Sequence, residues 1–134
     1  MRQTSAQFER TQFGPRWGSV ALFDPLRAED WHGQSGDCYT HTVYSLIGCP
    51  AMVAANYILV DHDANGVQRV LSIGRTRSGT PSLNLARIRK RGAILGANEV
   101  HLLRSGETDV ARAAIKRDLT RRHWADRGRI AAKH

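Results

Sequence analysis

The chain has 134 residues and carries 20 lysines and arginines against 12 aspartates and glutamates, a formal net charge of +8 at pH 7. This length favours one domain with a single core, and the hydrophobic content of 41% is ordinary for a soluble globular protein. Most of the basic residues are arginines. A guanidinium group can form two parallel hydrogen bonds with the oxygens of one phosphate, which an ammonium group cannot do. The composition therefore favours a polyanionic partner, of which nucleic acid is the commonest.

Two features lead us to expect a soluble, cytoplasmic protein without a membrane partner. The N-terminal segment lacks the apolar core of a signal peptide, and no apolar run approaches the length of a membrane span. Cys38 and Cys49 lack the spacing of a zinc site, so we interpret them as reduced thiols.

The composition divides the chain into three segments. Residues 1–36 are polar at first and then carry scattered bulky residues among prolines and glycines. This pattern favours an N-terminal arm packed on the core, with a candidate strand at residues 19–23. Residues 37–124 contain the regular apolar patterns and are predicted to form the α+β domain. Residues 125–134 are interpreted as a basic C-terminal tail.

The first half of the predicted domain contains three candidate strands. Residues 38–48 carry β-branched and aromatic residues in partial alternation, and residues 50–55 are a candidate helical turn. Residues 56–62 and 67–74 give the strongest strand predictions. The Asn-Gly dipeptide at residues 65–66 is typical of a tight hairpin, so these two strands should be adjacent and antiparallel.

Two helices are predicted beyond this hairpin, over residues 82–95 and 105–127, with a strand over residues 97–103 between them. The fold class is therefore α+β, with a small antiparallel sheet of three or four strands flanked by helices. The helical side chains expected to face the core are Leu83, Leu85, Ile88, Ile94, Val110, Ala114, Ile115 and Leu119.

The predicted elements follow in a fixed order. The strand NYILV and the strand that ends in LSIGRT are joined by a turn, and a basic helix, a further strand and a final helix come after them. This succession resembles the GIY-YIG nuclease family over roughly residues 55–119. In that family two adjacent antiparallel strands carry the Gly-Ile-Tyr and Tyr-Ile-Gly signatures. An arginine follows on the next helix, and a glutamate on a later helix binds one divalent metal ion. The resemblance implies a GIY-YIG-like fold and hydrolysis of phosphodiester bonds.

The resemblance assigns catalytic roles to individual residues. Tyr57 matches the tyrosine of the first signature, and Ile73-Gly74 matches the Ile-Gly of the second. Arg87 best matches the helix arginine, with Arg89 and Arg91 close enough to compete. Tyr57 could orient or deprotonate the attacking water, and Arg87 could clamp the phosphate. The structural alternatives are a core aromatic at Tyr57, a simple strand end at Gly74 and a solvated helix face around Arg87.

Three positions depart from the family pattern. The first signature reads Ala-Asn at residues 55–56, where the family has Gly-Ile. Ser72 replaces the second tyrosine and is the third candidate catalytic residue. Residues 112–114 read Arg-Ala-Ala where the metal-binding glutamate is expected, so Glu107 and Asp109 are the candidate ligands for Mg²⁺ or Mn²⁺. In the alternative interpretation both are first-turn acids that the helix dipole favours.

Further residues could hold the phosphate backbone. Gly74, at a strand end, allows either the close approach of a phosphate or a backbone angle that other residues avoid. The basic and hydroxyl side chains near it would supply hydrogen bonds to phosphate oxygens. The candidate nucleic-acid-binding residues are Gly74, Arg75, Thr76, Arg77, Arg89 and Arg91.

Three functions fit these observations. The first is a GIY-YIG-like endonuclease that uses one Mg²⁺ or Mn²⁺ ion, and the second is a catalytically inactive nucleic-acid-binding module of the same fold. The third is a basic protein-binding module for an acidic partner. Nucleic acid is the expected partner, with DNA favoured over RNA.

Overall fold

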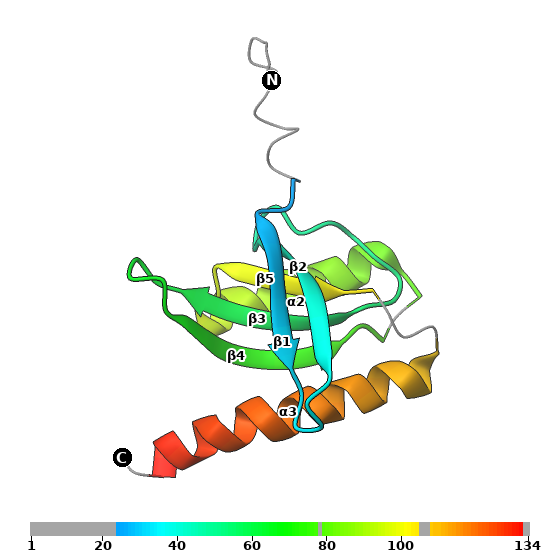
Figure 1. Cartoon of the computed structure of the whole chain (residues 1–134). Helices are drawn as coiled ribbons and strands as arrows, with labels where there is room; N and C mark the ends of the chain where they lie inside the picture. The colour runs from blue at the N-terminus through cyan, green and yellow to red at the C-terminus, as the bar shows by residue number, and fades with distance from the viewer. Residues whose placement is uncertain (1–23, 78, 105–107, 133–134) are drawn as a thin grey trace, which may run out of the picture.

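The computed structural model describes residues 24–77, 79–104 and 108–132 (Figure 1). The described chain forms β1 (Arg27–His32), β2 (Cys38–Ser45), β3 (Asn56–His62), β4 (Gln68–Arg75), α2 (Pro81–Leu95), β5 (Glu99–Leu103) and α3 (Asp109–Ala132). The candidate strand at residues 19–23 lies outside the described residues. Neither described helix has a stretch long and apolar enough to cross a membrane.

The strands form one antiparallel sheet in the order β1-β2-β5-β3-β4. The predicted α+β class with an antiparallel sheet is confirmed, but the expected three or four strands are wrong, because the described sheet has five. The additional strand is β1, within the segment interpreted as an arm. Its sequence RAEDWH alternates between half-buried and exposed residues. An edge strand of this kind buries one face only, so it lacks the continuous apolar run that marks the inner strands.

The turn between β3 and β4 follows the prediction from the Asn-Gly dipeptide. Gly66 adopts a left-handed backbone angle, with φ of 85°. The amide of Asp63 donates to the carbonyl of Val67 at 3.0 Å, and the Asp63 carboxylate accepts the amide protons of Asn65 and Val67 at 2.9 Å each. This side-chain bonding closes the turn and fixes how β3 and β4 pair.

The helices α2 and α3 pack on opposite faces of the sheet (Figure 1). Successive side chains of β3 alternate between the two faces. Leu59 packs in the cluster that contains Ile88 of α2, whereas Ile58 and Val60 pack in the cluster that contains Leu119 of α3. The edge of β4 therefore lies between two helices, one on each side of the sheet.

Half of the predicted core-facing helical residues do face the core. Leu85, Ile88, Ile115 and Leu119 pack against it. The other predictions are wrong: Leu83, Ile94 and Val110 are exposed by 41%, 73% and 80%, and Ala114 is also exposed. Leu83, Ile94 and Val110 lie in the first or last turns of their helices, where little of the sheet is left to cover them.

The segment before β3 contains no helical turn, so that prediction is wrong for residues 50–55. The side chain of Asn84 holds the segment instead, because its amide donates to the carbonyls of Met52 at 2.9 Å and Val53 at 3.3 Å. At the other end of the chain, α3 continues to Ala132, so residues 125–132 of the predicted tail are helical.

A buried carboxylate ties β1 to the centre of the sheet. Arg27 donates to both oxygens of Glu99 at 2.8 Å. Trp31 donates its indole N–H to Nδ1 of His101 at 2.9 Å, so His101 carries its proton on Nε2 and donates it to Glu99 at 3.0 Å. Although burial opposes ionisation, the hydrogen bonds from Arg27 and His101 lower the pKa of Glu99 to about 2.

Candidate functional site

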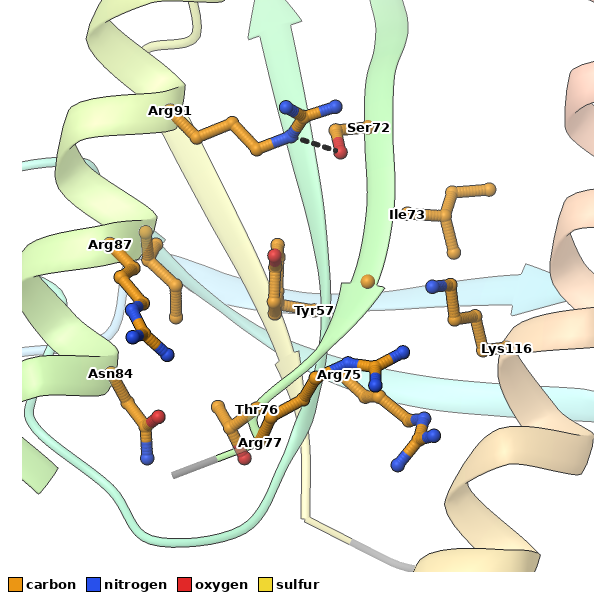
Figure 2. A pocket seen from close by; sticks show the side chains of 12 residues that line it. Tyr57, Ser72, Ile73, Arg75, Thr76, Arg77, Asn84, Arg87, Arg91 and Lys116 are labelled. Atoms are coloured by element: carbon orange, nitrogen blue, oxygen red, sulfur yellow. Dashed lines mark hydrogen bonds between the residues drawn. The ribbon is translucent and has the colours of Figure 1, made fainter. Parts of the chain in front are cut away.

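A cleft of about 280 Å³ lies at the free edge of β4. Figure 2 shows side chains of α2 on one side of this edge and Lys116 of α3 on the other, with Tyr57 of β3 between them. We call this hollow the basic cleft. Its lining residues are Tyr57, residues 72–77, Asn84, Arg87, Ile88, Arg91 and Lys116.

The basic cleft concentrates positive charge. Its described lining contains no carboxylate, and Asp109 beside it forms an ion pair with Arg75. The other basic side chains of the lining form no ion pair with any described residue. The cleft therefore attracts anions. The five basic residues of its lining are Arg75, Arg77, Arg87, Arg91 and Lys116.

The electrostatics of the cleft fix the protonation of Tyr57. Burial raises the pKa of Tyr57 above its ordinary value, and the nearby guanidinium groups of Arg91 and Arg77 oppose this rise only in part. The hydroxyl is thus protonated at neutral pH and makes no hydrogen bond to a described residue. It is suited to donate a hydrogen bond to a bound anion, and poorly suited to the deprotonation of water that the sequence suggested.

The pKa of Lys116 is lowered, whereas that of Tyr57 is raised. Burial and the positive charges of Arg77, Arg75 and Arg91 lower its pKa from the ordinary value of 10.5. A bound phosphate would relieve this repulsion, because it would place negative charge among the cations.

The backbone of β4 adds donors at the same edge. The amide of Thr76 donates to the carbonyl of Ala55 at 2.9 Å. This bond determines which residues of β4 direct their backbone N–H groups towards β3. Because alternate residues of an antiparallel pair face the partner strand, the N–H groups of Ile73 and Arg75 point away from β3. They lie at the free edge of the sheet, where the basic cleft is found.

The strand register brings the two predicted signatures together. Tyr57 pairs with Gly74, and Leu59 pairs with Ser72, on adjacent antiparallel strands as predicted. A Cβ atom on Gly74 would lie 2.5 Å from the Tyr57 hydroxyl oxygen. The glycine is therefore required for space. The alternative of an unusual backbone angle is wrong, because the described glycines with positive φ are Gly36, Gly66 and Gly96.

Ser72 and Thr76 hold their neighbours in place. Nε of Arg91 donates to the Ser72 hydroxyl at 3.0 Å, so Ser72 orients an arginine of the cleft (Figure 2). The Thr76 hydroxyl accepts from the amide of Ala55 and donates to the carbonyl of Val53, both at 3.0 Å. Both bonds fix the end of β4 to the segment before β3, so this hydroxyl already has structural partners.

Arg89 does not line the cleft. Its guanidinium group donates to the carbonyl of Ile47, and to that of Cys49 at 3.4 Å. The side chain thereby holds the connection after β2, on the side of α2 away from Arg87 and Arg91. These bonds give Arg89 a structural role, and its predicted role in nucleic-acid binding stays a prediction.

The described lining of the cleft is poor in ligands for Mg²⁺ or Mn²⁺. Such ions prefer carboxylate and other oxygen ligands, whereas the cleft presents guanidinium, ammonium and phenol groups. Asp109 is paired with Arg75, and Glu107 lies outside the described residues. Within the described chain no group of three or more potential metal-binding side chains gathers.

Lys116 is the basic lining residue of the cleft that the sequence did not predict. It follows Ile115 and precedes Leu119, which face the sheet, so it lies at the border of the buried face of α3. Helical periodicity contains this signal, since a border residue can reach past the edge of a sheet. The sequence does not reveal that β4 is the edge in question.

Comparison of the chain with protein-family models, curated proteins and solved structures gave no match. The resemblance to GIY-YIG nucleases therefore stays a prediction from short motifs.

Proposed function

We propose that the protein binds nucleic acid, with a backbone phosphate held in the basic cleft. The observation that carries this proposal is the set of five basic side chains around a hollow whose described lining has no carboxylate. Phosphate groups dominate the affinity of proteins for nucleic acids, and arginine and lysine are the residues that neutralise them.

The arrangement of the donors supports a phosphate as the ligand. Arg87 approaches from α2 and Lys116 from α3, with the protonated hydroxyl of Tyr57 between them (Figure 2). The outward N–H groups of β4 add uncharged donors at the same edge. A tetrahedral phosphate presents acceptor oxygens in several directions, so donors from opposite walls can bind it together.

Salt-dependent binding tests the proposal. The fluorescence anisotropy of labelled single-stranded and duplex DNA would be measured with the protein across a range of salt concentrations. Affinity should fall steeply with salt, with a log–log slope of about −0.9 per neutralised phosphate on duplex DNA and about −0.7 on single strands. The double variant Arg87→Ala/Lys116→Ala should bind at least about tenfold more weakly, because both walls of the cleft lose a cation.

A matched control removes the same charge elsewhere. Lys90 and Arg122 are exposed residues of the same two helices, outside the cleft. The double variant Lys90→Ala/Arg122→Ala should bind nearly as well as the unchanged protein. Equal losses in both double variants would mean that net charge alone binds DNA. Absence of DNA binding would favour the alternative of a basic module for an acidic protein partner.

Phosphodiester hydrolysis with Mg²⁺ or Mn²⁺ is the second candidate. It is favoured by one specific observation, that Tyr57 and Arg87 line the same cleft. A plasmid-nicking assay with either ion distinguishes the two functions. Nicking that Tyr57→Phe and Arg87→Ala both remove would support an endonuclease. DNA binding without nicking would leave the inactive binding module as the function.

A further inference from the structure

A second hollow continues the basic cleft along α3. It has a volume of about 320 Å³ and shares Arg75, Arg77 and Lys116 with the cleft. We call it the α3 hollow. The rest of its lining comes from α3 alone and consists of Ala113, Arg117, Thr120 and Arg121.

The lining residues of α3 form one face of the helix. They recur three or four positions apart, which places them one above the other along the helix. Arg117 and Arg121 are thus about 6 Å apart along the axis, so their side chains are neighbours on the helix surface and can approach the same anion.

Two cations of the α3 hollow, Arg117 and Arg121, have no described acid bound to them. Neither Arg117 nor Arg121 forms an ion pair with a described residue. Asp118, the acid between them in sequence, accepts hydrogen bonds from the hydroxyls of Ser35 at 2.6 Å and Tyr39 at 2.8 Å instead. Arg117 and Arg121 therefore form no ion pair that would compete with an external anion, whereas Arg75 is paired with Asp109.

We propose that a nucleic-acid strand runs from the basic cleft into the α3 hollow, where Arg117 and Arg121 bind a second, neighbouring phosphate. This inference rests on the proposed function. An isolated phosphate would need only one hollow, whereas two adjoining hollows of the same charge that share three cations fit a polymer with a repeated negative charge.

The test compares the double variant Arg117→Ala/Arg121→Ala with the charge-matched control Lys90→Ala/Arg122→Ala. The probe is a labelled oligothymidylate of about ten nucleotides, long enough to pass through both hollows. Loss of one phosphate contact should reduce the salt slope by about 0.7, which is about a fivefold loss of affinity at about 0.1 M salt. The control should keep the slope of the unchanged protein.

A mononucleotide used as competitor separates the two hollows. It should displace the oligothymidylate from the unchanged protein and from Arg117→Ala/Arg121→Ala at similar concentrations, because the basic cleft is intact in both. An unchanged salt slope in that variant would overturn the second phosphate site while the proposed function stands. Failure of the unchanged protein to bind the oligothymidylate or duplex DNA would overturn the proposed function itself.

Discussion

The ring of Tyr57 lies directly over the Cα of Gly74, its partner across the β3–β4 pair. A Cβ atom built on Gly74 would be 2.5 Å from the hydroxyl oxygen and 2.6 Å from the ring carbon that carries it. Atoms this close must move apart, so the small residue at position 74 determines where the Tyr57 hydroxyl sits in the basic cleft.

Gly74→Ala should therefore destabilise the protein and weaken DNA binding together. Overpacking of this kind costs about 1–3 kcal/mol, to be measured as a lower urea midpoint. Gly79→Ala is the matched control, because nothing lies within 4 Å of a Cβ at that position. Adding Tyr57→Val to Gly74→Ala should recover part of the lost stability. If the stability losses of Gly74→Ala and Tyr57→Val simply add in the double variant, the contact with Tyr57 is not the reason for glycine at position 74.

Substitutions of Arg87 and Arg89 should affect different properties of the protein, DNA affinity and stability, although the two residues are only two positions apart. Arg89→Ala removes donors to the carbonyls of Ile47 and Cys49, so it should lower the free energy of unfolding by about 1–3 kcal/mol and leave the salt slope unchanged. Arg87→Ala should lower DNA affinity with little effect on stability. Urea unfolding and anisotropy on both variants check this, and the reversed pattern would contradict the structural role of Arg89.

Asp109→Asn should strengthen DNA binding. The carboxylate of Asp109 is the described acid that pairs with a cation of the cleft, Arg75, and its side chain is 67% exposed. Exposed pairs contribute less than about 1 kcal/mol, so a rise in affinity of about two- to fivefold at low salt is expected. If Asp109 instead binds a catalytic metal ion, the same substitution would abolish any metal-dependent cleavage. Affinity and nicking assays on one variant distinguish these outcomes.

The buried His41 should make the protein sensitive to mild acid. Burial lowers the pKa of His41 from 6.5 to about 4, and the nearby His101 acts in the same direction. Between these values the unfolded chain binds the proton and the folded protein does not, so stability falls as the pH falls from 6.5 towards 4. By about pH 5 the free energy of unfolding should be lower by about 2 kcal/mol, measured as a shift of the urea midpoint.

The substitution His41→Asn removes this titration and can keep the hydrogen bond that Nδ1 makes with the carbonyl of Tyr39. The variant should be less stable at neutral pH but lose less stability on acidification. The remaining pH dependence should come from His101, whose pKa burial also lowers. An equally steep pH dependence in the variant would show that His41 is not its source.

Local sequence determined the hairpin on which the site is built. The Asn-Gly turn and the two apolar runs predicted β3 and β4, and with them that Tyr57 and Gly74 lie on adjacent antiparallel strands. These features were readable because turn chemistry and side-chain alternation act over a few residues. The sequence left open whether position 74 needs glycine, and the ring of Tyr57 supplies the reason.

Only the tertiary structure decided which cations form the site. Arg87 and Arg91 are four residues apart and share a face of α2, whereas Arg89 lies on the other side, and helical spacing alone predicts that separation. The sequence does not say which face meets β4, because the rotation of a helix about its axis is set by packing against the whole sheet. The same packing brings Lys116 to the cleft from α3 and makes β4 an edge strand of the described sheet, with β1 at the opposite edge.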